Sequence, residues 1–139
     1  MKDLKTTLLA VTLIFAMLLC FAGCNGEETE EAVGLWKDAT YTEDATVGEG
    51  SKTINCSIEQ GGKVITVTVK TDKDKLGDAL FECGLINDPS FFDTCNGMKA
   101  DWEADKAYWG FYIDGVLANV GVDDVEIHGG ERYGFVYTK

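Results

Sequence analysis

Three aromatic side chains and one amide are the residues best suited to hold a ligand. Tyr108 and Tyr112 flank Gly110, which has no side chain, and all three would share one face of a strand. Trp102 lies shortly before them and Asn119 shortly after them. Exposed aromatic rings stack on flat molecules and on sugars, and an amide adds hydrogen-bond donors and acceptors. Together these four side chains predict a small-molecule binding surface.

The two tyrosines are positioned by a predicted hairpin that has Asp114-Gly115 as its two-residue turn. That turn makes cross-strand neighbours of Ile113 and Val116, of Phe111 and Ala118, and of Trp109 and Val120. We expect this set to form the buried face, which makes the tryptophan structural and leaves the two tyrosines pointing outward. The alternative is that another strand, or the segment 36–41, covers both tyrosines, which would make them structural as well.

An earlier hairpin is predicted over residues 53–70, where apolar and polar side chains alternate on both sides of Gly61-Gly62. A two-residue turn there pairs Ile54 with Val69, Cys56 with Val67, and Ile58 with Ile65. All six side chains then lie on one face. Cys56 is therefore expected to be a core residue.

A short helix is predicted after this hairpin, because four apolar side chains recur at helical spacing: Leu76, Ala79, Leu80 and Cys83. Gly84 would end the helix, and Asp72 or Asp74 would cap its start. Its apolar stripe would cover the first hairpin. In the next loop, Phe91 and Phe92 are expected to anchor the chain to the core. The predicted fold class is α+β, a mixed or antiparallel sheet of hairpins packed on one short helix.

No group of residues in the sequence indicates catalysis. The stretch 48–53 lacks the glycine-lysine pair of a phosphate-binding loop, and a calcium loop counted from Asp72 would have apolar residues at ligand positions. The only histidine, His128, has no serine or cysteine nucleophile motif beside it, and the cysteine spacing fits no zinc site. We expect a binding protein rather than an enzyme, without a resident cofactor or metal.

The chain begins with a pattern typical of an export signal. Lys2 and Lys5 precede an apolar run over residues 8–21, which is shorter than the roughly 20 residues that a membrane span requires. The run ends in Ala22-Gly23-Cys24, which resembles the bacterial lipoprotein signal, in which the first mature residue is an acylated cysteine. We therefore expect a signal peptide over 1–23 and lipid attachment at Cys24.

The remaining chain is expected to reach the outer side of the cell membrane, held there by lipid. An acidic, polar tether over 24–34 would link the anchor to a domain over 35–139. The lipid bilayer is then a partner of the protein through Cys24.

The net charge limits the classes of partner that the protein can bind, and the number of cysteines limits the disulfides that it can form. The chain has 12 basic and 24 acidic residues, and cleavage before Cys24 leaves 116 residues with a net charge near −13. Such a charge argues against binding nucleic acid or an anionic lipid surface. One small domain fits this length. Three cysteines remain, Cys56, Cys83 and Cys95, so at most one intramolecular disulfide forms, and the sequence leaves its pairing open.

Six stretches carry turns and core aromatic residues in a distinctive order: Leu35–Tyr41, Gly48–Gly50, Leu76–Leu80, Ala107–Tyr112 with Asp114-Gly115, Gly121–Asp123 and Tyr133–Tyr137. Together they resemble a known family of bacterial surface domains of unassigned function, related to the C-terminal domain of transcobalamin and intrinsic factor. The resemblance implies a β-grasp-like domain used for binding, with corrinoid recognition known in the eukaryotic carriers. Those carriers hold their ligand against a large helical domain, for which 116 residues leave no room.

The sequence thus predicts a membrane-anchored extracellular binding module that captures a small molecule, such as a corrinoid, for uptake, or that docks to a surface protein. The alternative is a structural or adhesive cell-surface domain that acts through protein interactions. A ligand-sized hollow lined by aromatic side chains would favour small-molecule capture. A flat face or an open sheet edge would favour adhesion.

Overall fold

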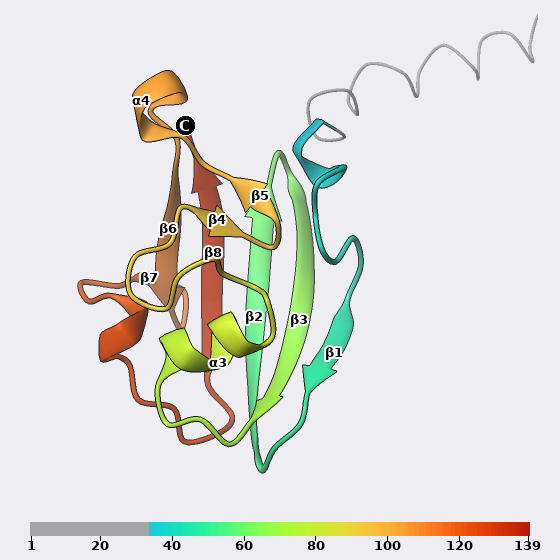
Figure 1. Ribbon diagram of the computed structural model, residues 1–139, viewed down its shortest axis with the longest axis vertical. Coiled ribbons are helices and arrows are strands. Elements are labelled where there is room, and N and C mark those ends of the chain that lie inside the picture. The colour runs from blue at the N-terminus through green and yellow to red at the C-terminus, as the bar shows by residue number, and fades with distance from the viewer. Residues whose placement is uncertain (1–33) are drawn as a thin grey trace, which may run out of the picture.

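The structure, a computed structural model, describes residues 34–139, so the apolar leader, Cys24 and most of the tether lie outside the described residues. One sheet forms the body of the domain (Figure 1). Its strands, in the order in which they lie side by side, are β1 (Ala45–Gly48), β3 (Lys63–Thr71), β2 (Lys52–Gln60), β8 (Arg132–Thr138), β6 (Tyr108–Ile113) and β7 (Val116–Leu117). The smaller elements are the α-helices α3 (Leu76–Glu82) and α4 (Trp102–Asp105), the 3-10 helix η1 (Val122–Asp124), and the strands β4 (Thr94–Cys95) and β5 (Met98–Lys99).

The strand order confirms a β-grasp arrangement. An antiparallel hairpin, β2–β3, is followed by α3, and the last strand, β8, returns to the centre of the sheet to lie parallel to β2. Strand β6 pairs antiparallel with the other side of β8, and β1 joins the edge of β3 in parallel. The predicted class, an α+β domain with a mixed sheet of hairpins packed on one short helix, is therefore the observed one, and the structure adds α4 and η1 to it.

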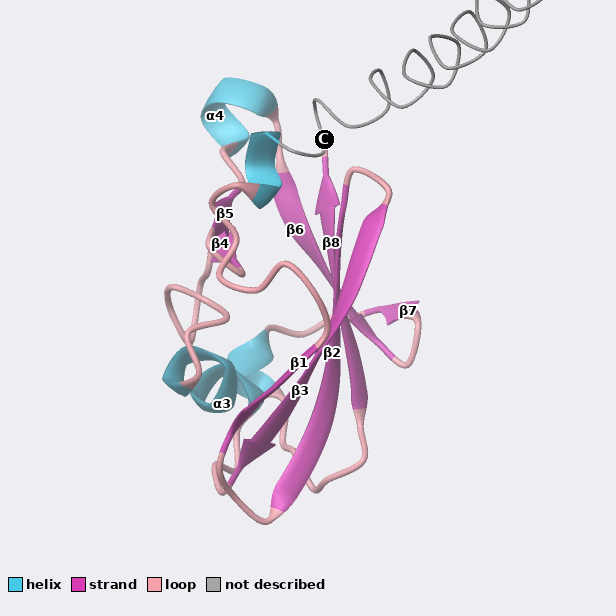
Figure 2. Cartoon of the chain, turned by 90° about the vertical axis from the view of Figure 1, so that its right-hand side faces the viewer, coloured by secondary structure: helices cyan, strands magenta, loops and turns pink. Residues whose placement is uncertain are grey.

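The α-helices α3 and α4 and the β4–β5 hairpin, here called the covering elements, lie on one side of the sheet. Figure 2 shows α3, α4 and the β4–β5 hairpin together on that side, while β7 turns out to the other. The core lies beneath the covering elements, where strand side chains meet Leu76 and Leu80 of α3. No helix within residues 34–139 has the length and apolar character that crossing a membrane requires.

The first hairpin has the predicted register. Ile54 pairs with Val69, Cys56 with Val67, and Ile58 with Ile65. These six side chains are all buried, at most 3% exposed, on the side of the sheet that α3 covers. β-Branched side chains fit the pleated surface of a strand, and polar residues such as Ser57 and Thr66 alternate with them on the opposite face.

Helix α3 ends as predicted but begins differently. Gly84 has a positive φ of 75°, and the N–H groups of Gly84 and Leu85 donate to the carbonyls of Phe81 and Leu80, which forms a Schellman motif. At the other end the cap position is Lys75, with no capping side chain. The prediction that Asp72 or Asp74 caps the helix is wrong, because both side chains bind other residues. Asp72 accepts hydrogen bonds from the backbone N–H and the hydroxyl of Ser51, and Asp74 pairs with Lys52.

The second hairpin is shorter than predicted. Ile113 pairs with Val116 across the Asp114-Gly115 turn as expected, but β7 ends at Leu117, so Trp109 does not pair with Val120. On its other side β6 pairs with β8, where Trp109 lies opposite Tyr137. Val116 is 69% exposed and Val120 44%, so these two are not part of a buried face. The chain leaves the sheet because η1 packs against α3, where it buries Val122.

The first described segment is fastened to the body at two places. The indole Nε1 of Trp36 donates to the Gln60 carbonyl at 3.1 Å. Further along, the fully buried Asn96 side chain accepts from the backbone N–H of Tyr41 at 2.9 Å and donates to its carbonyl at 2.8 Å. This segment therefore joins the end of β2 to the β4–β5 turn, and it lines neither the hollow beside Tyr108 nor that beside Tyr112.

All three cysteines of the domain are free thiols. Cys56 and Cys95 are buried, and Cys83 is half-buried at the end of α3, where its Sγ donates to the Leu80 carbonyl at 3.4 Å. Burial raises the thiol pKa of each of the three. The expectation that Cys56 and Cys83 belong to the core is confirmed for Cys56, whereas Cys83 packs at the edge of the core.

Candidate functional site

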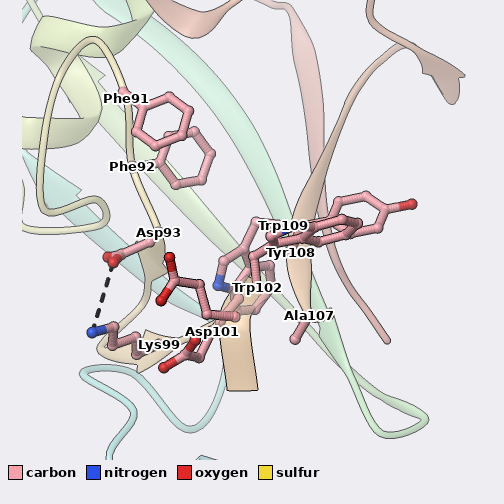
Figure 3. Close-up of a pocket in the computed structure, with 11 residues that line it drawn as sticks. Phe91, Phe92, Asp93, Lys99, Asp101, Trp102, Ala107, Tyr108 and Trp109 are labelled. Atoms are coloured by element: carbon pink, nitrogen blue, oxygen red, sulfur yellow. Dashed lines mark ion pairs between the residues drawn. The ribbon is translucent and has the colours of Figure 1, made fainter. Parts of the chain in front are cut away.

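A groove of about 560 Å³ opens between the Phe91–Phe92 loop and the start of β6. Figure 3 shows Phe91 and Phe92 on one side and Trp102 and Tyr108 on the other, with acidic side chains between the two pairs. The lining residues are Phe91, Phe92, Asp93, Lys99, Ala100, Asp101, Trp102, Glu103, Ala107, Tyr108 and Trp109. Its size lies within the range of small-molecule sites.

One wall is an aromatic pair from α4 and β6. Trp102 is 58% exposed and Tyr108 is 48% exposed. Their ring centroids lie 6.2 Å apart at an interplanar angle of 62°, an edge-to-face contact that holds both rings in place. Asp101 caps α4 by accepting from the backbone N–H of Ala104 at 3.0 Å. Two of the four predicted ligand-binding residues are thus brought together.

The opposite wall is set by a turn that Asp88 stabilises. Its Oδ1 accepts from the backbone N–H groups of Ser90 and Phe91 at 2.8 and 2.9 Å, and the hydrogen bonds from Phe91 and Ser90 lower the pKa of Asp88. The two phenylalanines then behave differently. Phe92 packs edge-to-face on Phe135 of the core at 5.8 Å, whereas Phe91 is 86% exposed. The expectation that Phe91 is an anchor is therefore wrong, because its backbone is held by Asp88 while its ring projects over the groove.

The floor of the groove includes the buried Trp109. Its indole Nε1 donates to the Met98 carbonyl at 3.0 Å, and its ring packs edge-to-face on Tyr137 at 5.4 Å. The structural role predicted for Trp109 is confirmed. Because this floor is fixed by a hydrogen bond and by core packing, the groove has a preformed base.

Charged groups between the two walls are predominantly acidic. Asp93, Asp101 and Glu103 face one basic side chain, Lys99, whose Nζ lies 3.9 Å from Asp93 Oδ2. Asp93 Oδ1 also accepts from the Asn87 amide at 2.9 Å. The groove therefore carries a net negative charge beside its aromatic walls.

Tyr112 and Asn119 are not part of this groove. Tyr112 is half-buried on the uncovered face of the sheet, where it packs against Gly134 and lines a separate hollow of about 540 Å³ with Ser57 and Arg132. Asn119 is exposed beyond β7 and lines neither hollow. The structure thus divides the predicted aromatic surface into two places.

Sequence reasoning missed the acidic part of the groove and the exposed ring of Phe91. In the sequence, Asp101 and Glu103 directly flank Trp102. This aromatic residue between two carboxylates is the pattern from which the acidic part of the groove could have been predicted. The groove also depends on Asp93, which reaches it only through the folding of the preceding loop.

Other candidate chemistry is limited. Within residues 34–139 no group of three or more histidine, cysteine, aspartate or glutamate side chains is placed to hold a metal ion. His128 precedes a turn, as predicted, and its Nδ1 lies 3.5 Å from Glu131. Burial tends to raise the pKa of Glu131, but hydrogen bonds from the N–H groups of His128 and Gly129 outweigh it and lower that pKa.

The fold is similar to those of solved binding proteins. A crystal structure from Ruminococcus gnavus, described as a putative metal binding protein, superposes with a TM-score of 0.59 at 19% identity, over 64% of this chain and 98% of that one. Haptocorrin in complex with Cbi superposes with a TM-score of 0.51 at 14% identity. That match covers 67% of this chain but 26% of haptocorrin, so this chain corresponds to a small part of that protein.

At these identities the two similarities establish the fold. None of the curated proteins matches the chain. The model of one family matches residues 61–139, which include α3, the whole groove and the last three strands of the sheet. The chain therefore belongs to the family described as Domain of unknown function (DUF4430).

Proposed function

We propose that this protein is a binding module, anchored by lipid on the outer side of the cell membrane, that captures a small molecule in the groove between Phe91 and Tyr108. One observation carries the proposal: three of the large apolar side chains that are exposed, Phe91, Trp102 and Tyr108, line a single hollow. Exposed aromatic rings gathered at a concave site mark a surface that another molecule covers.

The membrane anchor is the part of the proposal that rests on the sequence. Cys24 follows Ala22-Gly23 at the end of the apolar run and precedes an acidic tether. The test is Cys24→Ala in the full chain, expressed in a bacterium that processes lipoproteins. We expect the variant to lose its acyl chain and to leave the membrane fraction, or to remain unprocessed. Membrane retention of a cleaved, unacylated Cys24→Ala protein would contradict the anchor.

A corrinoid is the first ligand to test. Haptocorrin, which shares the fold, forms a complex with Cbi, and the aromatic walls of the groove suit a broad, flat molecule. The groove is open to solvent, because Phe91 and Trp102 in its walls are mostly exposed, so a ligand of that size would be covered only in part. Capture of such a molecule would suit delivery to an uptake system.

The experiment is a titration of the protein with cobinamide, followed by calorimetry, with matched tyrosine variants. Tyr108→Ala removes half of one groove wall, whereas Tyr112→Ala removes the same side chain from the same strand outside the groove. We expect Tyr108→Ala to weaken binding at least tenfold and Tyr112→Ala to leave it within twofold. Equal losses in both variants would mean that the groove is not the site, and absence of binding to the unmodified protein would exclude this ligand.

A second candidate function is adhesion through the exposed tip of the β6–β7 hairpin. Val116, Leu117 and Val120 are exposed there, and β7 lies on the side of the sheet opposite to α3 and α4 (Figure 2). Apolar exposure of this kind suits contact with another protein. Val116→Ser combined with Leu117→Ser would then abolish surface adhesion while leaving small-molecule binding unchanged, which separates this function from capture in the groove.

A further inference from the structure

We propose that the groove selects cations, and that its ligands are organic molecules carrying an ammonium or other positive group beside an apolar part. This inference rests on the proposed function, since it names the class of ligand that the same groove would take. It follows from three features of the lining, namely its aromatic rings, the sign of its charge, and a cation that one of its rings already holds.

The aromatic rings supply the first reason. The face of an aromatic ring carries a partial negative charge, so a cation near the face is attracted to it, most strongly by tryptophan. Trp102 and Tyr108 on one wall and Phe91 on the other are all exposed, and they line a hollow of about 560 Å³. That space admits a group larger than a single ion, and apolar substituents on the ligand would contact the rings.

The carboxylates supply the second reason. Lys99 lies close to Asp93, so these two opposite charges offset each other. Asp101 and Glu103 remain, which directly precede and follow Trp102 in the sequence and both line the groove, and Glu103 is exposed. An anionic ligand would meet these two carboxylates at short range, whereas a cation would be attracted both by them and by the rings.

The Trp102 ring supplies the third reason, because it already holds an ammonium group. The Nζ of Lys106 lies 5.3 Å from the ring centroid, within the range of a cation–π contact. Lys106 is exposed at the end of α4 and is not among the residues that line the groove. The ring and its acidic neighbours therefore form a setting that a positive group occupies in the folded protein.

The test uses three small aromatic probes that differ in charge: benzyltrimethylammonium, benzyl alcohol and phenylacetate. Binding to the full domain is followed by NMR through the indole N–H signal of Trp102. The signal of Trp36, which is buried and does not line the groove, serves as the internal reference. We expect the cation to shift the Trp102 signal saturably and to bind at least tenfold more tightly than the neutral and anionic probes. Raising the salt concentration should weaken cation binding, because the carboxylates lie near solvent.

Two matched substitutions separate local charge from the overall acidity of the chain. Glu103→Gln removes one negative charge from the groove, and Glu49→Gln removes one from the exposed β1–β2 loop at the opposite end of the domain (Figure 1). We expect Glu103→Gln to weaken binding of benzyltrimethylammonium at least threefold and Glu49→Gln to leave it unchanged. If the two substitutions weaken binding equally, the attraction of the cation is due to the net charge of the whole chain, and the inference that the groove itself selects cations is wrong.

The outcomes distinguish this inference from the proposed function. If benzyl alcohol or phenylacetate binds at Trp102 as tightly as the cation, or if cobinamide binds there and the cation does not, the charge selectivity is wrong and the binding groove stands. If cobinamide and all three probes leave the Trp102 signal unmoved, both the selectivity and the function proposed for the groove fail.

Discussion

The indole of Trp109 donates a hydrogen bond to the carbonyl of Met98 at 3.0 Å, which ties strand β6 to the β4–β5 hairpin beneath the groove. Trp109→Ala removes this bond together with a buried ring and should lower the free energy of unfolding by about 3–5 kcal/mol. A loss of that size is a large part of the stability of a small domain. Urea unfolding measures it.

Trp102→Ala is the matched control for this substitution. It removes the same side chain from an exposed position, so its effect on the free energy of unfolding should be much smaller. Tyr112→Ala, which removes a half-buried ring, should also cost far less than Trp109→Ala. Equal costs for the two tryptophans would show that the packing of Trp109 does not stabilise the domain.

Gly77 allows α3 to approach the loop that carries the groove wall. A Cβ at this position would lie 2.2 Å from the Pro89 carbonyl oxygen, and backbone cannot yield as a flexible side chain would. Alanine usually stabilises a helix relative to glycine by about 1 kcal/mol. Here we expect Gly77→Ala to lower the thermal midpoint instead, and to shift the NMR signals of Phe91. The substitution Asp78→Ala, at the next and exposed position, should do neither; a Gly77→Ala variant more stable than the parent would refute the close contact.

The three thiols should differ in reactivity. Burial raises the pKa of Cys56 and Cys95, so both remain protonated and inaccessible in the folded protein at pH 8. Cys83 is half-buried, and we expect a thiol reagent such as DTNB to modify it first, with the other two reacting only on unfolding. Single Cys→Ser variants identify the residue modified in each kinetic phase. Fast labelling of Cys56 in the native protein would contradict its place in the core.

Acid should release the Phe91 wall of the groove. Hydrogen bonds from Phe91 and Ser90 lower the pKa of Asp88 in the folded protein. A lowered pKa means that this stabilisation is present above the unfolded value, near 3.9, and is lost as the pH falls through the folded value. NMR titration from pH 6 to pH 2 should therefore move the amide signals of Ser90 and Phe91 only at the acid end. Asp88→Ala should show the same shifts already at pH 6. If neither the acid nor the substitution moves these amide signals, the Asp88 carboxylate does not hold the turn.

Local sequence patterns were sufficient for the first hairpin and for the end of α3. Alternation of apolar side chains on both sides of Gly61-Gly62 determined the pairing of Ile58 with Ile65, and Gly84 ended the helix, because turn geometry and side-chain period are short-range properties. The extension of the second hairpin could not be predicted in the same way. On the β7 side of β6 the pairing stops at Leu117, because the chain turns away to form η1, and this turn depends on contacts with α3 that are distant in sequence.

The same limit applies to the groove. Trp102 and Tyr108 are close in sequence and could be predicted as a pair of exposed rings. The opposite wall depends on Asp88 holding its turn and on Gly77 admitting Pro89, which are contacts that only the folded chain establishes. For this reason Phe91 was predicted to be an anchor although its ring projects into solvent.

The buried amide of Asn96, which holds the backbone of Tyr41 from both sides, has a mechanical consequence. Tension applied to the chain ahead of residue 34 is borne first by the Trp36 indole and next by Asn96, before it reaches β1. Strand β1 lies at the sheet edge and pairs only with β3, so a direct pull would peel it away one hydrogen bond at a time. The Trp36 attachment carries that load to the end of β2, and the Asn96 attachment carries it to the β4–β5 turn, so a pull on the leading end of the domain would reach the edge strand β1 last.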